Sequence, residues 1–329
     1  MGVFHYFRGV KTGFVATIGF FDGVHIGHRH LIRQATDEAA RRGLQSMVVS
    51  FDCHPRAVFA PDSIPELLTT SSERRQRLSE CGVDEILFLH FDQAMANLTA
   101  RDFMQQVLRD QLGVRVLIIG YDHHFGRPQR VLTSIENPSE RNQGKETERA
   151  EGFEDYCRYG QELGIEVLLA SELPGNLHIS SSVIRRALAT GDIATANQAL
   201  GRPYQWSGRV IHGQAIGHRL GFPTANFETL APEKMLPARG VYAVWVKDSQ
   251  TEHLFPAMLN IGKRPTVGGN DISIEAHLLN FVGDLYGKQL TLYFVERIRS
   301  EQRFESEQDL AKQLHEDRLK TMEILTQQK

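Results

Sequence analysis

The stretch Gly19-Phe20-Phe21-Asp22-Gly23-Val24-His25-Ile26-Gly27-His28 decides the fold of the first half of the chain, because it joins an apolar strand to a helix. Residues Phe14–Gly19 predict a buried strand. Residues His28–Arg42 predict a helix with apolar residues every four positions and with Gly43 as its C-cap. Glycines let a backbone approach an anion, and the free N–H groups at a helix start carry partial positive charge. The stretch therefore predicts a phosphate site at a strand-to-helix junction.

Strand-like and helix-like segments continue to alternate along the first half of the chain. We expect further strands at Ser46–Phe51, Glu85–His90, Val114–Ile119 and Ile165–Leu169, and further helices near Glu73–Cys81, after Thr99 and at Phe153–Leu163. This alternation predicts an α/β domain with a doubly wound, Rossmann-like parallel sheet, which binds ligands at the carboxyl ends of its strands. The polar segment Arg127–Ala150 shows no apolar period, and we expect it to be mostly a mobile surface loop.

The pattern changes near Gly201, where short apolar runs separated by Gly, Pro and Asn begin. These runs are Trp206–Ile211, Val241–Val246, Ala257–Ile261, Ile272–Leu279 and Leu290–Ile298. Five such runs predict an all-β antiparallel barrel, and a closing C-terminal helix is expected from Ser306 onward. The 329 residues therefore divide into a domain of residues 1–189, a linker of residues 190–202 and a second domain of residues 203–329.

Composition and charge narrow the class of protein. The chain has 37 basic and 40 acidic residues and a net charge of −3, so it offers no broad positive field and we expect no nucleic acid partner. Its three cysteines, Cys53, Cys81 and Cys157, support neither a disulfide framework nor a zinc knuckle. No stretch approaches the roughly 20 apolar residues that span a bilayer. We expect a cytoplasmic protein that does not bind membranes.

Two imidazoles stand at the start of the first helix. His25 and His28, separated by Ile26 and Gly27, can face one anion. In adenylyl transfer, charge builds on the α-phosphate of ATP as pyrophosphate leaves, and donors placed against that charge lower the barrier. Read alone, His-x-Gly-His fits a polar turn equally well. A zinc site is a weaker interpretation, because its third ligand would have to come from the pair His123-His124.

A second candidate phosphate site follows the last strand of the first half. The run His178-Ile179-Ser180-Ser181-Ser182-Val183-Ile184-Arg185 places three hydroxyls and an arginine at a helix start, which suits a polyphosphate. Taken alone, the run fits an N-cap serine before an amphipathic helix better. The two motifs together, one at each end of the same α/β half, favour a nucleotidyltransferase.

The glycine-rich run in the second half has residues suited to Mg-ATP. Bends at Gly208–Gly213 and Gly217–Asn226 can present backbone N–H groups to phosphates. Thr224 and Asn226 point the same way in extended chain and offer oxygen ligands to Mg²⁺, although a capped turn is the plainer interpretation. Glu275, on one face of a predicted strand, is either a base for an attacking hydroxyl or a solvated strand residue.

Residues 13–189 resemble the FMN adenylyltransferase module of bacterial bifunctional riboflavin kinase/FAD synthetases. The matching stretches are the first-helix motif, Phe51–Pro55, Gly120–Gly126 and Ile179–Arg185, with Cys53 where the family more often has Pro. The resemblance implies ATP phosphate contacts by His25 and His28 in a site that also includes Gly19, Phe20, Asp22 and Gly27. It further implies contacts to the leaving pyrophosphate by Ser181, Ser182 and Arg185, and a nucleotide and flavin loop with Asp122, Phe125 and Gly126.

Residues 203–329 resemble the riboflavin kinase domain, a small antiparallel barrel with a C-terminal helix. The runs Gly217–Asn226 and Asn260–Gly268 and the pair Glu275-x-His277 match in order, with His218 where the family often has Arg or Lys. The resemblance implies that Glu275 is the base on the riboflavin 5′-hydroxyl and that Arg299 lies on the flavin side. It implies an ATP site with Mg²⁺ at Thr224 and Asn226, flanked by Gly213, Gly217, Arg219 and Gly221.

The two resemblances together imply two ATP-dependent reactions in one chain. Riboflavin is phosphorylated to FMN, and FMN is adenylylated to FAD with release of pyrophosphate, so riboflavin, FMN, FAD and ATP are the expected ligands and Mg²⁺ the expected cofactor. One alternative is a flavin- and nucleotide-binding module without turnover. Another is a different small-molecule adenylyltransferase fused to an unrelated barrel.

Overall fold

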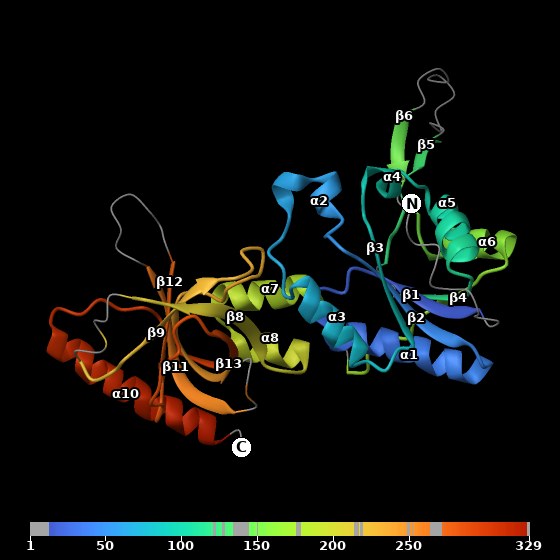
Figure 1. Ribbon diagram of the computed structural model, residues 1–329. Coiled ribbons are helices and arrows are strands. Elements are labelled where there is room, and N and C mark those ends of the chain that lie inside the picture. Colours follow the sequence, from blue (N-terminus) through green and yellow to red (C-terminus); the bar gives the residue numbers. More distant parts are fainter. Residues whose placement is uncertain are drawn as a thin grey trace. The chain divides into compact units, whose positions relative to one another are not determined.

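The computed structural model describes residues 13–120, 123–126, 151–175, 179–213, 217, 220–248, 251, 253–263 and 272–327, and only the backbone of residues 129–133 and 145–149. The chain forms two compact units (Figure 1). The first comprises residues 1–65 and 71–178, and the second comprises residues 66–70 and 179–329. No helix among the described residues is long and apolar enough to cross a membrane.

The first unit is built on a five-stranded parallel sheet with the strand order β3-β2-β1-β4-β7. Its strands are β1 (Phe14–Ile18), β2 (Gln45–Phe51), β3 (Glu85–Leu89), β4 (Val114–Ile119) and β7 (Glu166–Leu169). All five residues of β1 are buried, as expected of a strand covered on both faces. The predicted doubly wound sheet is confirmed.

Helices cover both faces of this sheet. They are α1 (Ile26–Arg42), α2 (Arg56–Phe59), α3 (Ser71–Ser79), α4 (Gln93–Ala96), α5 (Ala100–Asp102), the π-helix η3 (Phe103–Gln111) and α6 (Phe153–Leu163), with short 3₁₀ turns η1 (Asp22–Val24) and η2 (Pro61–Ser63). On one face, Ala16 of β1 packs in a core with residues of η3 and α6. On the other face, Val15 packs with Ala35 and Ala39 of α1. Gly43 ends α1 in the left-handed conformation, with φ of 65°, as predicted.

The prediction of a loop over Arg127–Ala150 is wrong for part of that segment. Strands β5 (Gln129–Thr133) and β6 (Lys145–Arg149) pair antiparallel as a two-stranded sheet. Backbone pairing between two strands needs no apolar face, so a polar sequence without an apolar period gave no sign of it.

The second unit is built on a closed barrel with the strand order β10-β11-β12-β9-β8-β13. Its strands are β8 (Tyr204–Ile211), β9 (Ala225–Thr229), β10 (Gly240–Asp248), β11 (Leu254–Lys263), β12 (Ile272–Leu278) and β13 (Gln289–Arg299). Helix α10 (Glu307–Thr326) lies along the outside of the barrel, and the Ser306 side chain caps it by accepting from the Asp309 N–H. The sequence predicts five of these strands and misses β9, which is short and ends in two exposed polar residues.

Helices α7 (Ser181–Thr190) and α8 (Ile193–Leu200) pack against the barrel. Ile184 and Leu188 of α7 and Ala196 of α8 share an apolar core with barrel residues such as Tyr242. Helix α8 occupies most of the segment that the sequence analysis assigns to a linker. The segment 66–70 also belongs here, since the Leu67 N–H donates to the Glu233 carbonyl at 2.7 Å and Leu68 is buried in the same core.

The Asn197 side chain joins helix α8 to two strands of the barrel. Its side chain donates to the Phe294 carbonyl at 2.8 Å and accepts from the Tyr204 N–H at 2.7 Å. We expect Asn197→Ala to lower the free energy of unfolding of the second unit by about 1–3 kcal/mol, because two buried backbone groups lose a partner. Tryptophan fluorescence during urea denaturation measures this unit, since both tryptophans of the chain, Trp206 and Trp245, lie in the barrel.

Gln198→Ala is the matched control, because Gln198 is the next residue of α8 and its side chain is exposed. Its expected effect is within about 0.5 kcal/mol. Equal losses of stability in the two variants would contradict the assigned role of Asn197.

Candidate active sites

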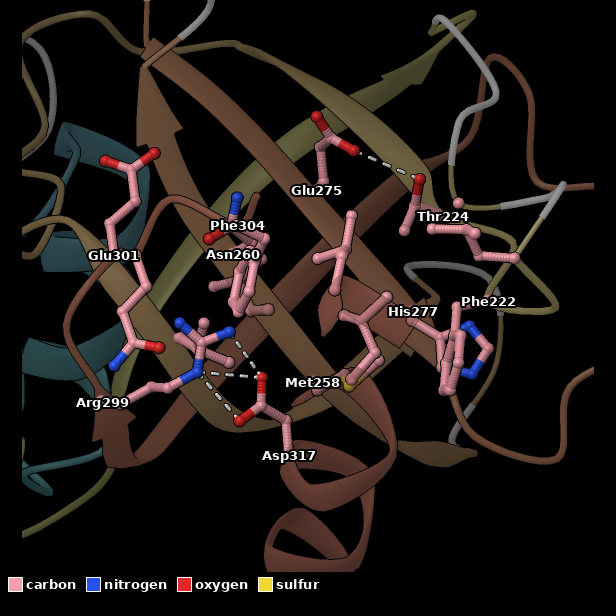
Figure 2. A pocket seen from close by; sticks show the side chains of 17 residues that line it. Phe222, Thr224, Met258, Asn260, Glu275, His277, Arg299, Glu301, Phe304 and Asp317 are labelled. Carbon is pink, nitrogen blue, oxygen red and sulfur yellow. Dashed lines mark hydrogen bonds and ion pairs between the residues drawn. The ribbon is translucent and has the colours of Figure 1, made fainter. Parts of the chain in front are cut away.

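A cavity of about 330 Å³ opens between the barrel strands and α10 in the second unit (Figure 2). Its lining includes Thr224, Asn260, Glu275, His277, Arg299 and Asp317. The volume falls in the range of small-molecule sites, and apolar side chains with a few polar groups line it, as such sites require.

Glu275 lies on β12, the middle one of three paired strands of the barrel. In β12 it is in register with Asn226 of β9 on one side and with Asn260 of β11 on the other. The Thr224 hydroxyl donates to Glu275 Oε2 at 3.3 Å, and Figure 2 shows the two side chains pointing toward one another. Three of the predicted kinase residues, Thr224, Asn226 and Glu275, are therefore brought together.

Glycines let the backbone approach these residues closely. A Cβ atom on Gly213 would lie 2.2 Å from Asn226 Nδ2, and one on Gly217 would lie 2.3 Å from the Phe222 carbonyl oxygen. Gly221 has φ of +80°, which L side chains rarely adopt. Any larger residue would displace the segment that carries Thr224. Arg219 and His218, also singled out from the sequence, lie outside the described residues.

His277 ties this segment to β12. Its Nδ1–H donates to the Pro223 carbonyl at 2.7 Å, and the assignment of the proton follows because a carbonyl can only accept. The Phe222 ring meets the imidazole edge-on at 5.3 Å. Burial lowers the pKa of His277, partly offset by the hydrogen bond to Pro223. The neutral ring thus holds Thr224 beside Glu275.

Arg299 is engaged by a carboxylate that the sequence analysis missed. Its Nε donates to Asp317 Oδ1 at 3.0 Å and its Nη2 to Oδ2 at 2.7 Å. Asp317 is 1% exposed and also accepts from Gln313 at 3.1 Å. The ion pair joins the end of β13 to α10 in the pocket wall (Figure 2). The available signal was the position of Asp317, three residues after Leu314 on the apolar stripe of the closing helix.

In the first unit, His25 and His28 stack at the start of α1, with ring centres 3.5 Å apart and planes 19° apart. His25 is also the N-cap of α1, accepting from the His28 N–H at 3.2 Å. For this reason the helix begins two residues before the predicted His28. Burial, together with the His25 and His123 rings, holds the pKa of His28 well below its usual value.

The turn before these histidines has an uncommon backbone. Phe21 has φ of 56°, Gly23 of 79° and Val24 of 39°, all in the left-handed region. For a non-glycine residue, such a conformation costs on the order of 1–3 kcal/mol and is found mainly at ligand sites. Asp22 is buried within the turn, and a Cβ atom on Gly19 would lie 3.1 Å from the Phe21 ring. The predicted phosphate site thus coincides with strained backbone.

Phe125 and Gly126 form a packed edge of the same unit. The Phe125 ring stacks on Tyr156 with centres 4.2 Å apart. Gly126 has φ of +82°, and a Cβ atom there would lie 2.3 Å from the Ala100 nitrogen. Asp122, the third residue predicted for this loop, lies outside the described residues.

The described residues contain no group of three or more His, Cys, Asp or Glu that could hold a metal ion, which does not support the zinc interpretation.

Comparison with known proteins covers both units. The family model for FAD synthetase matches residues 8–155, and the one for riboflavin kinase matches residues 200–325. The bifunctional riboflavin kinase/FMN adenylyltransferase of Escherichia coli (strain K12) is 37% identical over 324 residues, which are 98% of this chain and 96% of the relative. This chain belongs to the bifunctional riboflavin kinase/FMN adenylyltransferase family. It carries both activities, as the sequence analysis predicts, and neither alternative is favoured.

Two further similarities extend over the full family architecture. The Pseudomonas fluorescens bifunctional riboflavin kinase/FMN adenylyltransferase is 37% identical over 317 residues, 95% of this chain and 93% of the relative. A crystal structure from Streptococcus pneumoniae, described as a macrolide-efflux protein, is 30% identical with a TM-score of 0.80 and 95% coverage of both chains. The fold of both units is therefore shared with a solved structure.

The predicted pyrophosphate residues of this family member divide between the units. Ser181, Ser182 and Arg185 lie on α7, in the second unit, whereas His25 and His28 lie in the first. Ser180 caps α7 by accepting from the Val183 N–H, as the plainer interpretation of that motif expects. Arg185 Nε donates to the Glu66 carbonyl at 2.7 Å. A joint role of these residues in adenylyl transfer stays a prediction.

Arg74 of α3 is a buried cation that the sequence analysis missed. It is 1% exposed, donates to the Phe51 carbonyl at 2.6 Å, and lies 3.9 Å from the centre of the Phe20 ring. Burial lowers the pKa of Arg74 to about 10, against the opposing effect of the Asp22 and Asp52 carboxylates. It thus joins the ends of β1 and β2 beside the strained turn. One arginine among several in a polar helix gave no signal.

We expect Arg74→Met to lower kcat/KM for FAD formation from FMN by on the order of tenfold, the effect of about 1.4 kcal/mol. The reason is that Asp22 loses a buried positive neighbour and the Phe51 carbonyl loses a donor. Steady-state assays of FMN adenylylation measure it. Arg75→Met is the matched control, because Arg75 is the next residue of α3, is exposed, and shares the Phe88 ring contact with Arg74. An equal loss in both variants would show that Arg74 does not position the site.

Two histidines of the first unit, His90 and His123, should have well-separated pKa values. Burial lowers the pKa of His123 to about 4, whereas the hydrogen bond that His90 donates to Asp52 raises the pKa of the exposed His90. Unfolded imidazoles titrate near 6.5, so the stability contributed by neutral His123 is complete above pH 6.5 and is lost as the pH falls toward 4, by about 3 kcal/mol at most. NMR titration of the imidazole rings measures both pKa values. A higher pKa for His123 than for His90 would contradict the prediction.

Proposed function

We propose that the pocket of the second unit transfers the terminal phosphoryl group of ATP to the 5′-hydroxyl of riboflavin, with Glu275 as the base. The single observation that supports this assignment is the contact of 3.3 Å between the Thr224 hydroxyl and Glu275 Oε2. This contact puts Thr224, a candidate residue for binding Mg-ATP, next to Glu275, the candidate base, in the same cavity. Glu275 accepts the hydroxyl proton as the oxygen attacks phosphorus.

The oxygen donors of this pocket fit Mg²⁺ as the cofactor. Thr224, Asn226 and Glu275 offer a hydroxyl, an amide carbonyl and a carboxylate within paired strands. Mg²⁺ takes oxygen ligands, keeps several waters and needs few protein groups when it is bound with nucleotide phosphates. When bound, the ion neutralises charge on the phosphates. Thr224 and Asn226 hold it in this proposal, and the flanking glycines leave room for the phosphate chain.

For FAD formation, we propose that the α1 start of the first unit binds the ATP phosphates. His25 and His28 face the α-phosphate that FMN attacks, and Ser181, Ser182 and Arg185 receive the leaving pyrophosphate. Donors fixed in place before reaction stabilise the developing charge without a covalent intermediate. Support comes from the buried histidine stack and the strained turn beside it. In this proposal, residues 1–189 serve adenylyl transfer and residues 203–329 serve the kinase.

A cytoplasmic location is also proposed. All three cysteines are free in the structure. Free thiols suit a reducing compartment.

The two reactions should be separable by mutation. We expect Glu275→Gln to lower FMN formation from riboflavin by about 10²–10⁴-fold, because the amide cannot accept the hydroxyl proton, and to leave FAD formation from added FMN intact. We expect His25→Ala combined with His28→Ala to have the reverse effect. Chromatographic separation of riboflavin, FMN and FAD after incubation with ATP and Mg²⁺ measures both steps.

Each variant controls for the other, because the retained reaction shows that the protein is folded where that reaction occurs. Loss of both activities in either folded variant would contradict the division of labour. Bound but unchanged riboflavin in the wild type would contradict turnover altogether.

A further inference from the structure

Two imidazoles of the first unit each bury a nitrogen that lacks a hydrogen-bond partner. In the described part of the chain, these atoms are His28 Nδ1 and His123 Nε2. A buried polar atom without a partner costs about 1–3 kcal/mol, and in a native protein it calls for an explanation. Two such atoms near each other indicate a ligand that supplies the missing partners.

The two rings lie at the same edge of the sheet. His123 follows β4, with its N–H donating to the Gly120 carbonyl at 3.2 Å, and β4 pairs with β1, which leads into the His25–His28 motif. The His123 ring lies 5.8 Å from Phe125. Its charge is also among the effects that lower the pKa of His28. Both histidines therefore follow the carboxyl ends of two paired strands.

The charges around this pair select the kind of ligand. Among the described residues, those that act on His28 are His25 and His123, and the one that acts on His123 is His124. All are imidazoles. Imidazole N–H groups donate hydrogen bonds and phosphate oxygens accept them, so this group of imidazoles suits an anion. Buried Asp22 lies in the turn before His25.

We propose that His123 is a further ligand of the ATP polyphosphate in the adenylyl-transfer site, donating from Nε2 to a phosphate oxygen beside His28. This inference rests on the proposed function of the first unit. An anion placed between the two rings favours their protonated forms. Polyphosphate binding therefore takes up protons and strengthens as the pH falls below neutrality.

His123→Phe is the test variant, because it keeps an aromatic ring against Phe125 and removes both nitrogens. His30→Phe is the matched control, since His30 lies on α1 with its Nε2 at 3.1 Å from the Ser171 carbonyl.

For His123→Phe we expect a rise of about tenfold or more in KM for ATP during FAD formation, while FMN formation stays unchanged. Calorimetric titration with inorganic pyrophosphate, in buffers of different ionisation enthalpy, should show reduced proton uptake. His123→Gln, which keeps a donor, should recover part of the affinity.

Several results would overturn the inference. FAD formation and proton uptake equal to those of His30→Phe would show that His123 has no contact with the polyphosphate. Loss of FAD formation that His123→Gln does not relieve would assign His123 a structural role only. A wild-type chain that makes no FAD contradicts the proposed function and this inference together, whereas wild-type FAD formation with an unaffected His123→Phe variant contradicts the inference alone.

Discussion

Strand register is the constraint on which both sites depend. In the barrel, pairing of β12 with β9 and β11 fixes Glu275 beside Asn226 and Asn260, so a shift of one residue would turn Glu275 toward the core. In the first unit, parallel pairing of β1 with β2 and β4 brings the carboxyl ends of three strands to one edge. Strand pairing therefore brings together side chains that lie far apart in the sequence.

Several polar groups of the first site are desolvated and hold a nitrogen without a partner. Arg74, His28 and His123 hold buried atoms without a partner in the described residues, and burial lowers the pKa of each. Together with the left-handed backbone of Phe21 and Val24, these atoms make the edge of the first sheet energetically unfavourable without a ligand. In the barrel, by contrast, Arg299 and Asp317 satisfy one another. In the proposal for the first unit an anion supplies the missing partners, whereas the Arg299–Asp317 pair of the second unit needs none.

The sequence was sufficient to predict the elements whose apolar residues repeat. Strand β4 and helix α6 have the predicted bounds, because a buried run and an amphipathic stripe both depend on local composition. Strand β9 and the β5–β6 pair were missed, since β9 has only two buried residues and the sequence of β5 and β6 is polar without an apolar period. In the sites, glycine-rich motifs pointed to Thr224 and His28, and the family resemblance pointed to Glu275. Arg74 and Asp317 could not be found in the same way, because each depends on a partner far away in the sequence.

The chain passes between the two compact units three times, and this follows from where segment 66–70 packs. Leu67 pairs with the loop before β10, and the Glu66 carbonyl accepts from Arg185, a predicted pyrophosphate residue. Helix α3, which carries Arg74, begins at Ser71 directly after this segment. A short piece of backbone therefore connects the buried cation of the first unit to Arg185 in the second.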